Sequence, residues 1–332
     1  MSVLIVNHEE VRAILDMKTA IDVMEKAFTM LDNGGLVPPR SAMFVGGSKV
    51  LGAMPSYLNS IGKLGIKANT VFAGNSGSEY HIHQGVVLVF EDNHGCLEAI
   101  VDAAEITNIR TAAASGLATK LLADKNASEL AIIGAGTQGS HHLEAMLAVR
   151  QIRNVRVYDP APNIANEFFR RESKKHGARI DICGEVEQAV KGADIVCIST
   201  PSLTPVLLGN MVSEGVHINS VGFSGPAGRE LDNGLLKKAR LYVDCRESII
   251  RDCGDIILPI SEGIIKETDI IADLKELLTH KAEGRLEGSD ITLYKAAGVS
   301  IQDLACAFYI YGQAQKRGMG VSVNINGKNT NQ

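Results

Sequence analysis

The stretch Leu130-Ala-Ile-Ile-Gly134-Ala-Gly136-Thr-Gln-Gly139 decides the fold. It places the pattern G-x-G-x-x-G directly after an apolar strand and directly before a helix that begins near Ser140. In this setting Gly134 turns the chain tightly, Gly136 lets a pyrophosphate approach the backbone, and Gly139 lets the helix pack closely on the strand. The stretch therefore predicts a dinucleotide-binding domain of the Rossmann type, an α/β fold with a doubly wound parallel sheet.

A carboxylate follows at the spacing that such a domain requires. Asp159 ends the next strand, Val155-Arg-Val-Tyr158, and lies 20 residues after Gly139. There it can accept hydrogen bonds from the adenosine ribose hydroxyls, and its charge would repel a 2′-phosphate. We therefore predict NAD(H) as the cofactor in preference to NADP(H). The alternative, a glycine turn that binds no ligand, is disfavoured because strand, helix and carboxylate spacing agree.

Outside this stretch the chain has two kinds of pattern. Apolar strands alternate with helices as far as Leu241–Val243, which is typical of a parallel sheet covered on both faces. Before the glycine stretch, a helical stripe from Met17 to Leu31 precedes several strand-like segments and a helix that ends at Leu122. We place the domain boundary at the polar break Asp124-Lys-Asn126, so that residues 1–123 form a first domain and residues 124–299 the nucleotide domain. A last helix runs roughly from Ile301 to Gln315.

The composition excludes several classes of protein. The 332 residues include 33 Lys and Arg against 38 Asp and Glu, a net charge of −5, with no long basic run, so nucleic acid is not an expected partner. No apolar stretch is long enough to span a membrane, and we expect a cytoplasmic protein. The six cysteines form no C-x-x-C pair and are expected to be reduced. The pairs His81/His83 and His141/His142 lack partners at metal-ligand spacing, so no metal is expected.

Three cations in the first domain are candidates for binding an anionic substrate. Arg40 follows Pro38-Pro39, Lys67 lies within a strand, and Arg110 lies among alanines. A buried cation needs an anionic partner, and a guanidinium matches the geometry of a carboxylate. From spacing alone, a clamp for a substrate carboxylate and a set of internal salt bridges are both open.

Blocks along nearly the whole chain resemble the ornithine cyclodeaminase/mu-crystallin family. The blocks that carry the resemblance are Arg40, Leu51-Gly-Ala-Met-Pro-Ser-Tyr57, Lys67, His83-Gln-Gly-Val-Val-Leu88, Arg110-Thr-Ala-Ala-Ala-Ser115, the glycine stretch, His217-Ile-Asn-Ser-Val-Gly-Phe-Ser-Gly-Pro226 and Glu230-Leu-Asp232. The resemblance implies a homodimer that contacts its partner through the first domain, an α+β substrate-binding and dimerisation domain of residues 1–123 completed by residues 300–332. It also implies that Arg40, Lys67 and Arg110 hold the carboxylate of an amino or imino acid beside the nicotinamide.

The chain departs from the cyclodeaminases of that family at three positions. Ser224 stands where the resemblance places a catalytic aspartate, Gly52 where it places a glutamate, and Lys295 where it places an acidic residue. All three changes remove negative charge, and a hydroxyl cannot replace a carboxylate base near neutral pH. The chain is thus similar to the mu-crystallin branch, which resembles reductases of cyclic ketimines, although Asp159 differs from the NADPH preference implied for mu-crystallin. Lys295 could instead pair with Asp303 or another acid at the surface.

We therefore predict an NADH-dependent reductase of a 2-imino acid, either a cyclic ketimine such as pyrroline-2-carboxylate or the imine of a 2-oxo acid, reversible as an amino-acid dehydrogenase. An ornithine cyclodeaminase and a non-enzymatic, mu-crystallin-like binding protein are the alternatives. The expected catalytic residues are Lys67, Arg110, Ser224 and Lys295, and the substrate-binding residues are Arg40, Met54, Lys67, His83 and Arg110. The expected cofactor-binding residues are Thr111, Gly134, Gly136, Thr137, Gln138, Gly139, Asp159, Ser199, Thr200, Val221, Gly222 and Ser224.

Overall fold

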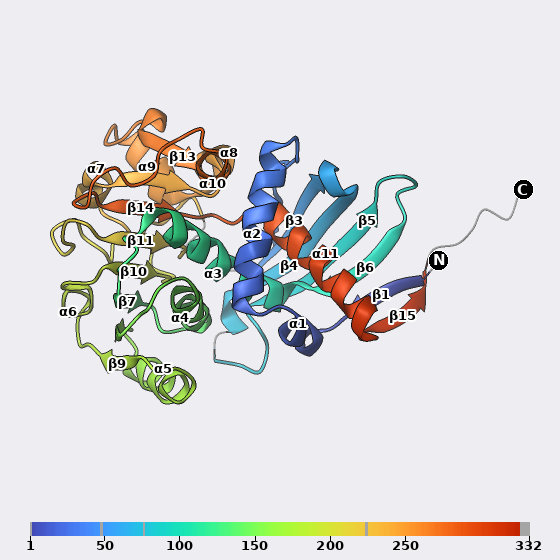
Figure 1. Cartoon of the computed structure of the whole chain (residues 1–332), viewed down its shortest axis with the longest axis horizontal. Helices are drawn as coiled ribbons and strands as arrows, with labels where there is room; N and C mark the ends of the chain where they lie inside the picture. The colour runs from blue at the N-terminus through green and yellow to red at the C-terminus, as the bar shows by residue number, and fades with distance from the viewer. Residues whose placement is uncertain (1, 47–48, 76, 223–224, 326–332) are drawn as a thin grey trace, which may run out of the picture. The chain divides into compact units, whose positions relative to one another are not determined.

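The computed structural model describes residues 2–46, 49–75, 77–222 and 225–325 (Figure 1). The chain divides into two compact units, one of Met1–Arg110 with Val299–Gln332 and one of Thr111–Gly298. The division falls inside helix α3 (Ala103–Leu122), whereas the polar break that suggested a boundary in the sequence follows the end of that helix. Among the described residues, no helix is long and apolar enough to cross a membrane.

The second unit is built on an eight-stranded sheet in which every pairing is parallel. Its strand order is β13-β12-β14-β11-β10-β7-β8-β9. This confirms the predicted α/β fold with a Rossmann-type sheet. Burial of the central strand β10 explains why its sequence, Ile195-Val-Cys-Ile198, is continuously apolar. The strands are β7 (Glu129–Ile133), β8 (Asn154–Tyr158), β9 (Arg179–Ile182), β10 (Ile195–Ile198), β11 (His217–Ser220), β12 (Arg240–Val243), β13 (Ile270–Asp273) and β14 (Thr292–Lys295).

Helices follow most strands of this sheet, as expected for a doubly wound fold. The central strands and the helices share one continuous buried core of apolar side chains. The strands contribute Ala131, Ile133, Val196, Ile198 and Ile218 to it. The helices are the second part of α3, then α4 (Thr137–Val149), α5 (Pro162–Lys175), α6 (Val186–Val190), α7 (Asn233–Lys238), α8 (Arg246–Asp252), α9 (Gly254–Ser261) and α10 (Leu274–Leu278), with a short 3-10 turn, η3 (Glu267–Asp269).

The first unit is a seven-stranded sheet with helices packed on it. Its order is β15-β1-β6-β5-β4-β3-β2, antiparallel except for the parallel pair of β1 and β6. The strands are β1 (Ser2–Val6), β2 (Ser41–Phe44), β3 (Lys49–Leu58), β4 (Lys63–Phe72), β5 (His83–Glu91), β6 (Leu97–Asp102) and β15 (Val321–Asn324), with 3-10 turns η1 (Asn59–Ile61) and η2 (Ala73–Asn75). The helices are α1 (His8–Ile14), α2 (Met17–Asp32), the first part of α3, and α11 (Ser300–Arg317).

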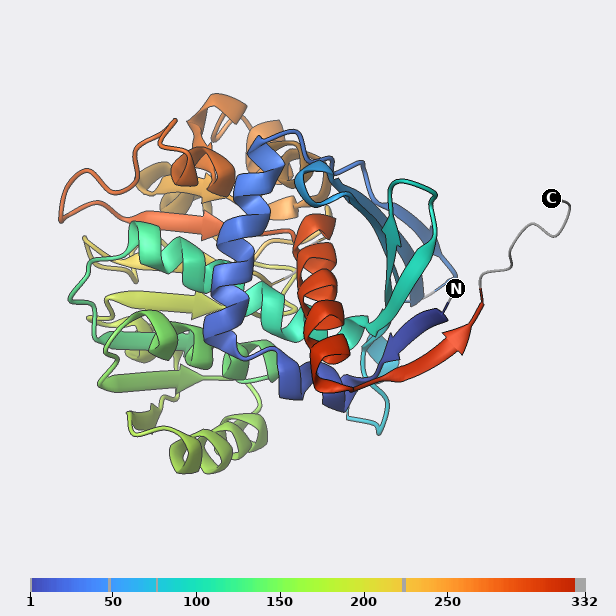
Figure 2. The same ribbon diagram turned by 45° about the vertical axis from the view of Figure 1, so that its right-hand side comes forward.

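Helix α11 brings the end of the chain back onto the sheet of the first unit. Figure 2 shows α11 beside α2, and α11 also contacts β3, β4 and β5. The close approach depends on Gly65 of β4, because a Cβ atom there would lie 2.5 Å from Leu304 Cδ1. Helix α2 starts at its N-cap Asp16 and buries Met17, Ile21 and Phe28, the stripe that the sequence periodicity predicts. The first unit therefore needs the last helix to cover its sheet.

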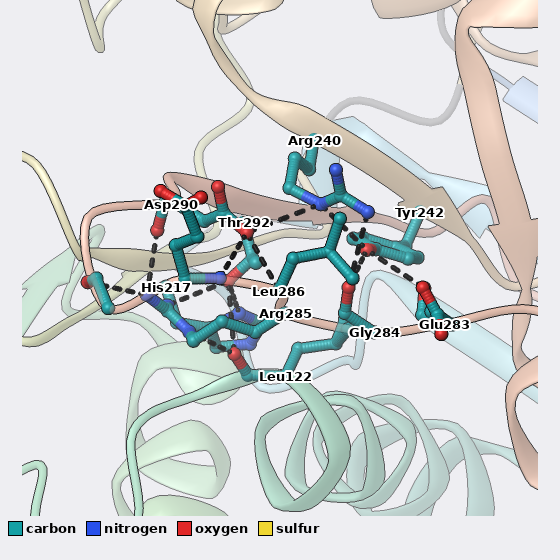
Figure 3. Close-up of polar contacts among 12 residues, drawn as sticks. Leu122, His217, Arg240, Tyr242, Glu283, Gly284, Arg285, Leu286, Asp290 and Thr292 are labelled. Carbon is teal, nitrogen blue, oxygen red and sulfur yellow. Dashed lines mark hydrogen bonds and ion pairs between the residues drawn. The ribbon is translucent and has the colours of Figure 1, made fainter.

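A polar network at the amino ends of the strands ties α3 to the sheet of the second unit (Figure 3). His217, the first residue of β11, hydrogen-bonds through Nδ1 to Thr292 Oγ1 at 2.9 Å. Arg285 donates to the carbonyl of Leu122 at 2.8 Å and to Thr292 Oγ1 at 3.1 Å, so it caps the C-terminal end of α3. Burial lowers the pKa of His217 to about 3, which keeps the imidazole neutral.

Two further contacts extend this network. Asn219 donates from Nδ2 to Thr119 Oγ1 of α3 at 2.8 Å. On β12, which lies on the other side of β14 from β11, the Tyr242 hydroxyl donates to the carbonyl of Gly284 at 2.7 Å, and Arg240 donates to the same carbonyl (Figure 3). The block His217-Ile-Asn219 is one of those that carry the family resemblance. In the structure its side chains bind Thr119 of α3 and Thr292, so they help to hold α3 and the 283–292 segment against the sheet.

Candidate functional site

The three glycines of the decisive stretch meet three different structural demands. Gly134 has a φ of +97°, and a Cβ atom there would lie 2.6 Å from the carbonyl oxygen of Ser199. A Cβ atom at Gly139 would lie 2.2 Å from the carbonyl oxygen of Gly134, so α4 can pack on β7 only with glycine. A Cβ atom at Gly136 would meet nothing within 4 Å, which leaves this face of the loop open.

The start of α4 fits the pyrophosphate of a dinucleotide. Gly136 is the N-cap of α4 and provides no side-chain hydrogen bond to the first turn, which contains Thr137 and Gln138. Backbone N–H groups at such a helix end carry partial positive charge and bind phosphate. Gln138 Oε1, in the first turn of α4, is buried without a hydrogen-bond partner and can accept a hydrogen bond from a ligand. These residues fit the cofactor that the glycine pattern predicts.

Asp159 holds the glycine loop to the end of β8. Its Oδ2 accepts a hydrogen bond from the backbone N–H of Ala135 at 2.9 Å, and its Oδ1 accepts one from Ala161 at 2.9 Å. The carboxylate therefore lies where β7 and β8 end, on the side of the site where the adenosine ribose is expected. Direct contact of Asp159 with the ribose stays a prediction.

The strand order brings the other expected cofactor residues to the same edge. Strand β10 lies beside β7 and β11 beside β10, so Ser199 and Thr200 end up next to the glycine loop, and Val221 and Gly222 next to them. Ser199 Oγ hydrogen-bonds to the carbonyl oxygen of Gly134 at 3.4 Å. Parallel sheets bind ligands at the edge where the strand order reverses, here between β7 and β10.

Two further residues, Thr111 and Ser224, were also predicted to bind the cofactor. Thr111 lies in α3 and is the first residue of the second unit. Ser224, which was also predicted to be catalytic, lies outside the described residues.

In the first unit, Lys67 and Arg110 share one buried carboxylate. Lys67 Nζ lies 3.0 Å from Asp303 Oδ1, and Arg110 Nε lies 3.3 Å from the same oxygen. Lys67 also donates to Thr107 Oγ1 at 2.5 Å, and Arg110 Nη1 to Gln302 Oε1 at 2.8 Å. Side-chain exposure is 4% for Lys67, 8% for Arg110 and 0% for Asp303. Two buried cations against one carboxylate leave a positive surplus that suits an anionic ligand.

The remaining substrate-binding candidates lie on the same side of this sheet. In the strand register Met54 pairs with Lys67, and Lys67 with Val87, so these side chains share a face. His83 lies four residues before Val87 on β5 and shares that face as well. Arg40 directly precedes β2 and is close enough to Lys67 to affect its pKa. The fold thus brings Arg40, Met54, Lys67, His83 and Arg110 together within one unit.

Burial and charge tune the titratable groups of this face. Burial lowers the pKa of Lys67 to about 8, with Asp303 opposing the shift and the charges of Arg110 and Arg40 adding to it. Surrounding protein atoms, and then the charges of Lys67 and Arg110, lower the pKa of His83 to about 4, although part of its surface faces solvent. Lys67 can therefore exchange a proton near neutral pH, while His83 stays neutral there.

Lys295 lies in different surroundings from those suggested by the sequence. It ends β14 inside the second unit, is 0% exposed, and pairs with Asp255 at 2.8 Å and with Glu230 at 3.7 Å. The alternative that Lys295 pairs with an acid is confirmed, but its partners are buried. Asp303 is not one of them, because it binds Lys67 and Arg110 in the first unit. The sequence does not reveal that β14, the last strand of this sheet along the chain, lies between β11 and β12.

The sequence did not reveal the roles of three acids that shape these sites, Asp303, Glu230 and Asp255. Asp303 is an acid within an otherwise apolar stripe of the last helix, between Ile301 and Leu304, and that contrast is the signal that could have marked it. Glu230 was visible only as part of a family block, and no local signal marks Asp255. No group of three or more His, Cys, Asp or Glu side chains suited to a metal ion occurs in the described part of the chain.

Known proteins match this chain over nearly its whole length. The model of the ornithine cyclodeaminase/mu-crystallin family matches residues 1–318. The chain is 35% identical to a Delta(1)-pyrroline-2-carboxylate reductase of Thermococcus litoralis, solved with NADH and L-proline, which aligns with a TM-score of 0.94 over 97% of this chain and 100% of that one. A dimeric archaeal alanine dehydrogenase with bound NAD is 32% identical and aligns with a TM-score of 0.93 over 98% and 100%.

A mammalian relative matches in sequence. The ketimine reductase mu-crystallin of Mus musculus is 35% identical over 281 residues, 84% of this chain and 86% of that protein. Together with the glycine loop and the cations Arg40, Lys67 and Arg110, these matches identify the chain as a member of the ornithine cyclodeaminase/mu-crystallin family and an NAD-dependent oxidoreductase.

Proposed function

We propose that the protein reduces the C=N bond of a 2-imino acid with NADH, and that the reaction is reversible as an amino-acid dehydrogenase. The substrate is a cyclic ketimine such as pyrroline-2-carboxylate or the imine of a 2-oxo acid. The observation that carries this proposal is the buried pair Lys67 and Arg110 around the single carboxylate of Asp303. The Thermococcus litoralis relative supports it, because L-proline is the amino acid that results from reduction of pyrroline-2-carboxylate.

The three cations of this face, Arg40, Lys67 and Arg110, each have a role in this reaction. Arg110 and Arg40 pair with the substrate carboxylate and orient the imine carbon. Bound NADH supplies the hydride. As the carbon accepts it, the π electrons of the C=N bond move to nitrogen, where the Lys67 ammonium supplies the proton. Lys67 suits this role better than Lys295, whose ammonium is taken up by acceptors inside the second unit.

The first test is to mix the purified protein with NADH and pyrroline-2-carboxylate and to follow NADH absorbance and proline. We expect NADH loss matched by proline. L-ornithine with NAD is tested in parallel, and ammonia release without net NADH change would identify a cyclodeaminase instead. Binding of NADH without turnover of any imine or amino acid would favour a binding protein.

The carboxylate clamp predicts a selective effect of Arg110→Met. Loss of one buried, hydrogen-bonded charge at a binding site costs about 2–5 kcal/mol, so kcat/KM for the imine should fall at least about 30-fold. The Kd for NADH should not change. The matched control is Arg12→Met, because Arg12 is a 60%-exposed arginine of the same unit that pairs with Glu105. Unchanged turnover in Arg110→Met would exclude the clamp.

The pKa of Lys67 predicts the pH dependence of reduction. Because the ammonium form donates the proton, kcat/KM at saturating NADH should be flat below about pH 8 and fall above it. In Lys67→Arg the positive charge persists at high pH. We therefore expect a lower kcat/KM than in the wild type, without the fall above about pH 8. Lys63→Met, in the same strand and paired with Glu98, is the control and should keep the wild-type profile. An identical fall in Lys67→Arg would assign it to the substrate's own ionisation.

We propose a preference for NADH over NADPH because Asp159 lies at the end of β8. Asp159→Ser should raise the ratio of kcat/KM for NADPH to that for NADH by about tenfold or more, since the 2′-phosphate no longer meets a carboxylate. Asp181→Asn on the neighbouring strand, where Asp181 pairs with Arg179, is the control. Equal losses with both cofactors would limit Asp159 to fixing the glycine loop through Ala135.

We also propose that the protein forms a homodimer through the first unit, as the archaeal relative is a dimer. In the strand register Met43 pairs with Leu51, and both lie on the face of the sheet opposite Met54 and α11. They are 57% and 44% exposed, and Leu64, at 39%, shares that face. Such an apolar sheet face is typical of an interface.

The dimer predicts twice the chain mass in light scattering after gel filtration at micromolar concentration. Leu51→Glu should shift the protein to monomer, because a carboxylate buried in an apolar contact lacks a partner. Leu286→Glu, a similarly exposed leucine of the second unit, should leave the mass unchanged. A monomeric wild-type protein would contradict the proposal.

A further inference from the structure

One buried carboxylate connects the two loops that follow β10 and β11. Glu230 is 0% exposed. Its Oε2 accepts hydrogen bonds from the backbone N–H of Thr200 at 3.2 Å and from Thr200 Oγ1 at 3.1 Å. Its Oε1 accepts from Ser220 Oγ at 2.7 Å and from the backbone N–H of Gly222 at 3.1 Å. Each oxygen therefore serves one loop, and the carboxylate fixes the distance between them.

Lys295 and Asp255 hold this carboxylate in place. Lys295 Nζ lies 3.7 Å from Glu230 Oε1 and donates to the carbonyl oxygen of Gly222 at 3.0 Å. Asp255 Oδ1 accepts from the backbone N–H groups of Glu230 and Leu231 at 2.9 and 3.0 Å. All three charged groups are fully buried, and such groups persist only where they are paired and hydrogen-bonded.

The loop that follows β11 packs directly on the Glu230 carboxylate. A Cβ atom at Gly222 would lie 2.0 Å from Glu230 Oε2 and 2.3 Å from the carbonyl oxygen of Thr200. Gly222 therefore has to be glycine because of Glu230 and Thr200, rather than because of its own backbone angles. Glycine at position 222 is therefore needed for Glu230 and Lys295 to reach the backbone of this loop.

The position of these loops on the sheet edge indicates which half of the cofactor they serve. The glycine loop follows β7 and Asp159 directly follows β8, so the pyrophosphate and the adenosine half belong to that side of the site. Strands β10 and β11 continue the sheet on the other side of β7. A dinucleotide that lies across this edge places its nicotinamide half over the loops after β10 and β11.

We propose that Glu230, with Lys295 as its counter-ion, is a positioning residue that sets the two loops to receive the nicotinamide half of the cofactor. Neither residue contacts the reacting atoms. Glu230 acts through Thr200 and Gly222, and Lys295 acts through Glu230 and the Gly222 carbonyl. This inference uses the NAD-dependent activity and does not depend on which imine is the substrate.

The test compares two ligands on the Glu230→Gln variant. The amide has only one acceptor oxygen and turns an NH2 group toward the N–H donors of one loop, so that loop loses its anchor. We expect the Kd for NADH, measured by fluorescence titration, to rise about tenfold, the effect of losing one such anchor. The Kd for ADP-ribose, which lacks the nicotinamide, should stay within about twofold.

The matched control is Glu172→Gln. Glu172 is a buried carboxylate of α5 in the same unit that pairs with Arg171 and with the C-cap residue His176. Its loss should lower thermal stability without changing either Kd. If Glu230→Gln does not fold, Ser220→Ala removes one donor to Glu230 and should weaken NADH alone by about threefold. Equal weakening of NADH and ADP-ribose, or no change in either, would overturn the proposal.

Discussion

The first unit depends on the placement of Asp303 between Lys67 and Arg110. Lys67 comes from β4, Arg110 from α3 and Asp303 from α11, so one carboxylate joins three segments that are far apart in the sequence. Without it, two buried cations would repel each other in surroundings of low dielectric constant. The anion has to come from the last helix, since that helix covers the sheet from which Lys67 projects. Packing of α11 therefore also supplies the carboxylate that offsets part of the positive charge of Lys67 and Arg110.

The second unit separates its structural and its ligand-binding chemistry between the two edges of one sheet. At the amino ends of the strands, His217, Thr292 and Arg285 close the network that caps α3. At the carboxyl ends, the open side of the loop at Gly136 and the first turn of α4 offer backbone N–H groups to a phosphate. The separation follows from parallel strand direction, which gives every loop at one edge the same polarity. The amino edge can therefore be filled with satisfied hydrogen bonds without obstructing the cofactor.

Local patterns in the sequence predicted those parts of the molecule that short-range physics determines. The glycine stretch, Asp159 and the buried stripe of α2 each depend on spacings of 20 residues or fewer. The partners of buried charges do not, because 236 residues separate Lys67 from Asp303. The same limit hid the partners of Lys295, which became visible only when β14 took its place between β11 and β12. Strand β1 was missed because its pairing with β15 joins the two ends of the chain.

The two buried charge centres have opposite balances, and each balance fits its place. In the first unit, a lysine and an arginine face one aspartate, so positive charge remains for a substrate carboxylate. In the second unit, Glu230 and Asp255 face one lysine, and the Lys295 ammonium also donates to Ser220 and Gly222. No positive charge is left there for an anion. A lysine in an apolar strand therefore indicates substrate binding only where the number of acids around it is smaller than the number of cations, and sequence position alone does not give that count.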